Sequence, residues 1–305
     1  MAFDLYFAGT GPKKVINFKY EHNTNQLFSQ LNERSSIKNY INKVNDIHNA
    51  KLFIDSGAWS AHSQGKEVNM DDYISFLNQY DEYLYIYAEL DKIPGEFRKP
   101  KTKEQILEAP EISWKNYLYM KDKVKSRDKL LPVFHQGEDF KWLVNMLEYT
   151  HPDTNTHIPY IGISPANDSS IPGKLAFVDR CFDIIFKSSN PNVKTHAFGM
   201  TSLDILEQYP FTSADSTSYL MCAINGSIMT DYGIVNLSNR RLTKDNALFI
   251  EDKELLNKLI TKYDFTLEEL SDDIGARAVY NIKYLLDWCN NYQYKPSSIK
   301  KLNLF

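Results

Sequence analysis

The alternation of strand-like and helix-like segments most constrains the fold of this chain. Seven short apolar segments are typical of buried strands, and segments with helical spacing lie between them, as at 70–80, 138–149 and 175–186. Strands that alternate with helices pair in parallel. Seven of them in 305 residues favour a closed barrel over an open sheet. The predicted strands span residues 5–8, 52–55, 84–90, 130–134, 160–163, 195–198 and 211–215.

The predicted fold class is therefore an α/β TIM (β/α)8 barrel, possibly irregular, with a C-terminal helical extension. The eighth strand is not evident, because residues 24–31 read as helical and 224–237 read as a hairpin with Asn-Gly and Asp-Tyr-Gly turns. Residues 94–110 are charged and punctuated by proline, which predicts a long functional loop. We expect a barrel domain at 1–243 and a helical extension at 244–305 packed on its exterior.

Composition excludes several classes of protein. The chain shows neither a signal peptide nor an apolar run of about 18 residues, so we expect no membrane span. The three cysteines form no C-x-x-C pair, which argues against a disulfide framework or a cysteine zinc site. A cytoplasmic location is expected.

Charge is informative only locally. The net charge of −4 argues mildly against a dedicated nucleic-acid-binding domain. Basic clusters nevertheless occur, and they fit either solvated helix faces or a surface that contacts phosphates. The clusters expected to bind nucleic acid comprise Arg98, Lys99, Lys101, Arg240 and Arg241.

Polar side chains gather where the predicted strands end, as expected for the catalytic rim of a barrel. Asp55 and Asp215 both follow apolar runs and precede small, turn-forming residues. Paired carboxylates suit cleavage at an acetal-like carbon, where one attacks and the other moves a proton. Helix capping by aspartate is the plainer explanation, and a metal site is a third. The full set at predicted strand ends is Asp55, Asp91, His135, Gln136, Ser164, His196 and Asp215.

The order of several motifs resembles the tRNA-guanine transglycosylase superfamily. Residues 55–60 (DSGAWS) resemble its D-S-G-G-F-Q motif, and residues 133–137 (VFHQG) are similar to its V-Q-G segment. Residues 161–163 (IGI) resemble the G-G-L-A-V-G strand, and 196–200 (HAFGM) resemble H-L-M-G-V. The match runs in order from about residue 50 to 240. It is most like the zinc-less, phage-type 7-deazaguanine DNA transglycosylases, because the C-x-C-x-x-C zinc subdomain of the tRNA enzymes is absent.

This resemblance implies a TIM-barrel enzyme that exchanges guanine in DNA for a 7-deazaguanine base, without a cofactor or metal. It implies that Asp215 is the nucleophile and that Asp55 transfers protons. The residues that it implies for binding the base are Ser56, Asp91, Gln136, Gly162 and His196. A tRNA substrate, a barrel hydrolase of small glycosides or nucleosides, and a non-catalytic nucleic-acid-binding barrel remain alternatives.

Overall fold

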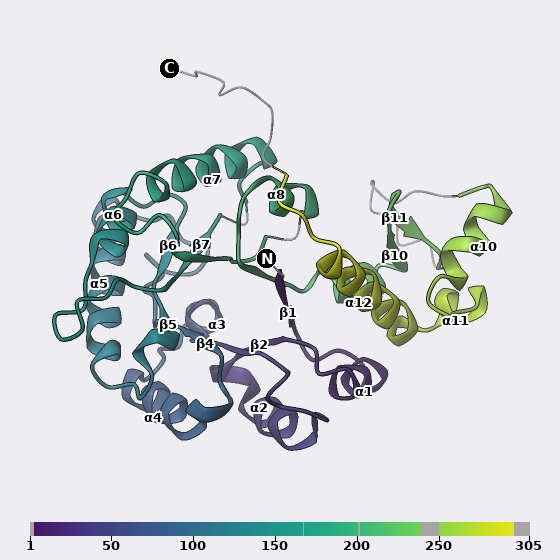
Figure 1. The fold of residues 1–305 in the computed structure, drawn as a ribbon, viewed down its shortest axis with the longest axis horizontal. Coiled ribbons are helices and arrows are strands. Elements are labelled where there is room, and N and C mark those ends of the chain that lie inside the picture. The colour runs from purple at the N-terminus through teal and green to yellow at the C-terminus, as the bar shows by residue number, and fades with distance from the viewer. Residues whose placement is uncertain (1–2, 167, 201, 239–249, 296–305) are drawn as a thin grey trace.

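The computed structural model describes residues 3–166, 168–200, 202–238 and 250–295. A single parallel sheet of nine strands forms its centre, in the order β5-β4-β3-β2-β1-β9-β8-β7-β6 (Figure 1). The strands are β1 (Asp4–Ala8), β2 (Gln26–Ser29), β3 (Leu52–Asp55), β4 (Ile86–Ala88), β5 (Leu130–Leu131), β6 (Val133–His135), β7 (Tyr160–Ser164), β8 (Lys194–Ala197) and β9 (Ser213–Ser216).

The sheet closes on itself at Pro132. Strands β5 and β6 stand at opposite ends of the strand order, yet only this proline separates them in the chain. β5 pairs with β4, and β6 pairs with β7. Proline has no N–H to give to the ladder, which interrupts the strand, but its carbonyl still accepts a hydrogen bond from Gly162 at 2.8 Å. Counted as one strand, β5 and β6 complete an eight-stranded TIM-like barrel.

Strand β2 supplies the strand that the sequence did not reveal, and the predicted helix over 24–31 is wrong. Residues of β2 pair with β1 on one side and β3 on the other. The buried amide of Gln26 donates to Thr24 Oγ1 at 2.7 Å, so this polar residue is satisfied inside the wall. Tertiary pairing thus overrides a weak local preference.

Helices surround the barrel wall (Figure 1). The predicted long loop over 94–110 is too long, because α5 begins at Lys103, where Thr102 and Gln105 form a capping box. The first nine helices are α1 (Lys13–Glu21), α2 (Gln30–Lys43), α3 (Ala58–Ser63), α4 (Met70–Tyr80), α5 (Lys103–Lys121), α6 (Lys141–Glu148), α7 (Ile171–Ile185), α8 (Leu203–Gln208) and α9 (Ser218–Ile224).

The predicted hairpin is confirmed as β10 (Ser227–Thr230) and β11 (Gly233–Asn236), which pair antiparallel. It lies beside the barrel with α10 (Lys253–Thr261) and α11 (Leu267–Asp272), beyond α12 (Ile274–Asn290) (Figure 1). A separate apolar cluster that includes Ile228, Leu270 and Tyr280 joins these elements. The boundary placed between residues 243 and 244 lies outside the described residues.

Helix α12 attaches the extension to the barrel. It packs against α1, α9 and β1. Near its end, the ring of Trp288 meets Phe3 edge to face with centroids 5.2 Å apart. Lys14 of α1 pairs with Asp273 at 3.0 Å, just before α12 begins. The final helix therefore covers the first strand. None of the helices in the described ranges is both long and apolar enough to cross a membrane.

Candidate active site

Strand alternation turns four polar side chains toward the interior of the barrel at its C-terminal rim. Phe53, Val133 and Tyr160 belong to the apolar cluster that fills the interior, while their chain neighbours pack outward against helices. Side chains two residues apart on a strand share a face. The corresponding positions at the rim are those of Asp55, His135, Ser164 and Asp215. Asp215, for example, follows Ser213 by two residues, and Ser213 faces inward, where its Oγ meets Tyr160 OH.

The carboxylate of Asp215 is held by two neighbours through a single oxygen. The amide of Gly199 donates to Oδ1 at 2.9 Å, and His196 Nε2 lies 3.3 Å from the same atom. Among the described residues no hydrogen bond reaches Oδ2. The carboxylate is therefore oriented by one oxygen, and its side chain is 15% exposed at the rim.

A buried hydrogen-bond chain supports Asp215 from below. Tyr160 OH lies 2.6 Å from Ser213 Oγ, which lies 2.6 Å from His196 Nδ1. His196 is fully buried, and burial lowers its pKa although Asp215 opposes this shift. A neutral imidazole donates a hydrogen bond from one ring nitrogen and accepts a hydrogen bond at the other. His196 therefore orients Asp215 rather than meeting a ligand itself.

Asp55 is suited to proton transfer near neutral pH. Burial, followed by the charges of Asp91 and Asp215, raises its pKa to about 7, although the Gly57 amide opposes the shift. That amide donates to Asp55 Oδ2 at 3.1 Å. Asp55 and Asp215 lie at the C-terminal ends of β3 and β9, on the same rim of the barrel, and the charge of Asp215 is a smaller cause of the raised pKa of Asp55. A carboxyl group with this pKa can both give and take a proton at physiological pH.

The turn after Asp55 requires glycine. Gly57 has a φ of 80°, and a Cβ there would lie 2.6 Å from Leu31 Cβ and 2.7 Å from Ser29 Oγ. The preceding residue, Ser56, is buried, and its Oγ accepts a hydrogen bond from the Ala58 amide at 3.2 Å. This tight turn fixes Asp55 and starts helix α3.

Asp91 and His135 form a second pair of acid and imidazole. His135 Nε2 lies 3.2 Å from Asp91 Oδ2, which is the separation of an ion pair, although the nitrogen makes no hydrogen bond. Ser56 Oγ lies 3.5 Å from the other oxygen of Asp91. Burial lowers the pKa of His135, but Asp91, Glu138 and Asp55 more than offset it, so the net pKa is raised.

Two of the expected base-binding residues have packing roles in this structure. A Cβ on Gly162 would lie 2.5 Å from Phe198 Cε2, so glycine lets that ring lie against the strand. The Gln136 amide donates to Ser169 Oγ at 3.1 Å and accepts from the Ala166 amide at 3.0 Å. Gln136 thus ties the loop after β7, and a base would have to displace one of these partners to reach its amide.

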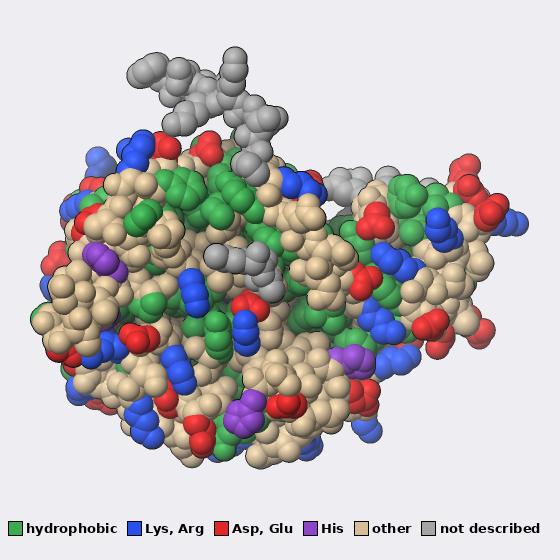
Figure 2. Space-filling view, viewed as in Figure 1, with side chains coloured by type: hydrophobic (Ala, Val, Ile, Leu, Met, Phe, Trp, Pro, Cys, Tyr) green, Lys and Arg blue, Asp and Glu red, His purple; other side chains and the backbone are tan. Residues whose placement is uncertain are grey.

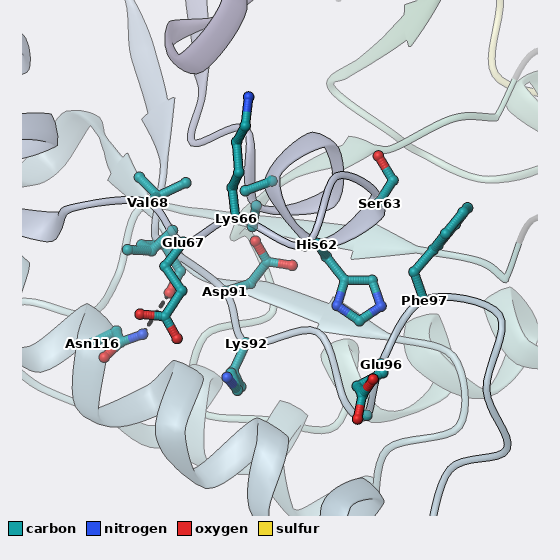
Figure 3. Close-up of a pocket in the computed structure, with 15 residues that line it drawn as sticks. His62, Ser63, Lys66, Glu67, Val68, Asp91, Lys92, Glu96, Phe97 and Asn116 are labelled. Atoms are coloured by element: carbon teal, nitrogen blue, oxygen red, sulfur yellow. Dashed lines mark hydrogen bonds between the residues drawn. The ribbon is translucent and has the colours of Figure 1, made fainter.

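A cavity of about 550 Å³ opens beside Asp91, between the segments that follow β3 and β4. In Figure 3, Asp91 lies between two groups of lining side chains. His62 and Phe97 are on one side of it, and Glu67 and Asn116 are on the other. Asp55 and Asp215 do not line it. The volume accommodates a ligand the size of a purine nucleotide.

His62 and Phe97 line this cavity, and Trp59 and Arg98 both lie against the ring of Phe97. We call Trp59, His62, Phe97 and Arg98 the aromatic rim. The rings of Trp59 and Phe97 are 54% and 37% exposed, and their centroids lie 6.1 Å apart. The Arg98 guanidinium lies over the Phe97 ring at 5.1 Å, from a left-handed backbone conformation with φ 62°. The sequence reasoning did not identify the aromatic members. The sequence signals for them are the three-residue spacing of Trp59 and His62 and the position of Phe97 beside the basic cluster.

The expected phosphate contacts are only partly assembled. Lys99 pairs with Glu96. Burial lowers the pKa of His62, and the positive charges of Lys101 and Lys92 lower it further. Arg240 and Arg241 lie outside the described residues. Acidic and basic side chains are interspersed over the visible face in Figure 2, without one large basic field.

In the described part of the chain, no group of three or more His, Cys, Asp or Glu residues is arranged to hold a metal ion. A search against models of protein families finds no match, and a search of curated proteins finds none either.

Proposed function

We propose that this protein is a base-exchange glycosyltransferase that replaces guanine in DNA with a 7-deazaguanine derivative. The observation that carries the proposal is the presence of two carboxylates with different surroundings on the same rim of the barrel. Asp215 is held through Oδ1, while Asp55 has a pKa of about 7. Carboxylate pairs of this kind serve double displacement at a sugar carbon.

In the proposed first step, Asp215 Oδ2 attacks C1′ of the nucleotide as the bond from C1′ to guanine N9 breaks. The bonding electrons leave with the purine, and positive charge develops on the sugar. Nearby carboxylates stabilise that charge in a site shielded from water. The product is a covalent glycosyl ester on Asp215.

In the second step, N9 of the incoming base attacks the same C1′ and releases Asp215. Two displacements retain the configuration at the sugar. Asp55 can accept and return a proton during this exchange because its pKa lies near neutrality. Asp91, at the border of the cavity, is placed to bind the edge of the purine through its carboxylate.

The aromatic rim supports a nucleic-acid substrate. Exposed rings stack on bases, and Arg98 and Lys101 lie close to them. A target in duplex DNA must be flipped out of the stack, and exposed rings beside a cavity can replace the lost base stacking. The preference for DNA over tRNA rests on the absent zinc subdomain.

The test is to incubate the protein with labelled guanine and, separately, single-stranded DNA, duplex DNA and tRNA. We expect label in DNA and a covalent adduct on a denaturing gel. Asp215→Asn should abolish both, whereas Asp204→Asn, on the exposed first turn of α8, should retain both. Full exchange by Asp215→Asn would refute the nucleophile. Release of guanine without incorporation would indicate a hydrolase, and labelling of tRNA alone would overturn the choice of DNA.

A further inference from the structure

His135 is the imidazole of the rim for which the two displacement steps above assign no task. It ends β6 at the same level as Asp55 and Asp215, and its side chain is 29% exposed despite lying inside the rim. His196, by contrast, is fully buried and bonded through both ring nitrogens. Of these two histidines, therefore, only His135 combines access to a ligand with a titratable ring.

Charged groups on three elements face His135. Asp91 lies 3.2 Å from Nε2 in the segment after β4, Asp55 belongs to β3, and Glu138 follows in its own turn. Glu138 also accepts a hydrogen bond from the His135 amide at 3.2 Å, which fixes the backbone. None of the described residues hydrogen-bonds Nδ1. Three acidic neighbours stabilise an imidazolium, and this second nitrogen remains to meet a ligand.

We propose that His135, paired with Asp91, is the catalytic acid that protonates the departing purine and the base that deprotonates the incoming one. The inference rests on the proposed function. When the bond from C1′ to N9 breaks, the electron pair moves onto the purine, and the His135 imidazolium gives its proton to a purine ring nitrogen. The neutral imidazole then takes the N9 proton of the incoming base, which restores the imidazolium.

This assignment moves proton transfer with the purine from Asp55 to His135. A departing guanine anion is a poor leaving group, so protonation contributes about 100-fold or more to the rate. Asp91 holds the imidazolium in place and compensates its charge, as an acid beside a catalytic histidine does. Under this proposal His135 is the catalytic residue, and Asp91 is a positioning residue that affects proton transfer through His135.

A leaving group that needs no proton tests the proposal. A 7-methylguanine base is already cationic in DNA and departs as a neutral molecule. We expect His135→Gln to slow guanine exchange about 100-fold or more but to slow release of 7-methylguanine less than tenfold. His48→Gln, an exposed histidine before β3, should change neither rate. Equal losses on both substrates, or no loss on guanine, would overturn the assignment.

Should His135→Gln fail to fold, the wild-type protein still decides the question. The rate of guanine exchange should fall on the alkaline side as His135 loses its proton, while release of 7-methylguanine should lack that limb. The same limb on both substrates would refute the role of His135. No exchange by the wild type on any nucleic acid would instead refute the proposed function, and the role of His135 with it.

Discussion

Glu89 accepts a hydrogen bond from the amide of Val133 at 3.0 Å, directly beside the interruption that Pro132 makes in the barrel wall. The Glu89 carboxyl is fully buried, and burial raises its pKa well above the usual value, although the Val133 amide opposes this shift. The Glu89 carboxyl group therefore replaces a missing backbone partner. The side chain closes the ladder where proline cannot.

Replacing Glu89 should separate its hydrogen bond from its charge. Glu89→Ala leaves the buried Val133 amide without a partner, so we expect a loss of about 2–4 kcal/mol in the free energy of unfolding. Glu89→Gln keeps an acceptor of similar shape and should cost less than about 1 kcal/mol. Chemical denaturation of the three proteins at neutral pH measures both values. Equal losses would show that the hydrogen bond is unimportant.

Gly57→Ala should destabilise the turn that carries Asp55. The new Cβ would combine a φ of 80° with contacts of 2.6 and 2.7 Å, so we expect a loss of about 2–4 kcal/mol. Gly65→Ala is the matched control, since Gly65 has a φ of 63° and open space around it. That variant should lose only about 1–2 kcal/mol, from the backbone conformation alone. Thermal melting compares them, and a milder effect at Gly57 would contradict the steric argument.

Asp55 should make stability depend on pH. Its folded pKa of about 7 exceeds its unfolded value of about 3.9, so the folded state binds more protons between these limits. Stability contributed by the protonated group is therefore complete below about pH 4 and is lost as pH rises toward 7. The free energy of unfolding of Asp55→Asn, relative to that of the wild type, should therefore rise by up to about 1.4 kcal/mol per pH unit across this window. Screening by water reduces this figure.

Denaturant unfolding at pH 5 and pH 8 measures the gain of Asp55→Asn. Asp204→Asn serves as a control for loss of an exposed carboxylate. An offset between Asp55→Asn and the wild type that stays constant across pH would contradict the shift.

The aromatic rim should contribute to binding of single-stranded nucleic acid. Trp59→Ala removes an exposed stacking surface, which should weaken binding of a short single strand by about 1–3 kcal/mol. Tyr232→Ala is the matched control, because its ring is 59% exposed on the β10–β11 turn away from the cavity. Fluorescence anisotropy with a labelled oligonucleotide compares the variants. Equal affinities for Trp59→Ala and Tyr232→Ala would remove the aromatic rim from the interface.

Sequence patterns sufficed for the strands with continuous apolar runs, such as β3 and β7, because burial on both faces leaves few polar positions. They failed at β2, where Gln26 and Ser29 are polar and the strand forms through its pairing with β1 and β3. They also placed helix α5 too late, since Pro110 reads as a breaker but lies inside the helix. Long-range pairing, rather than local preference, decides the case of β2.

The candidate site was likewise predictable from the sequence only in part. Asp55 and Asp215 were identifiable because the end of a strand fixes both the position and the face of a side chain. The pairing of His135 with Asp91 depends on how the segment after β4 meets the end of β6, and the meeting of Trp59 with Phe97 depends on how the segments after β3 and β4 pack together. Their separation in sequence carries no periodic signal, so no pattern could reveal them.

The position of α12 has a consequence for synthesis of this protein. Strand β1 is synthesised well before α12, the helix that covers it with Trp288 against Phe3. The apolar outer face of β1 therefore stays unburied while the residues between these two elements are translated. Contacts of such long sequence separation slow folding, so a nascent chain stalled before Ile274 would be an expected client of chaperones.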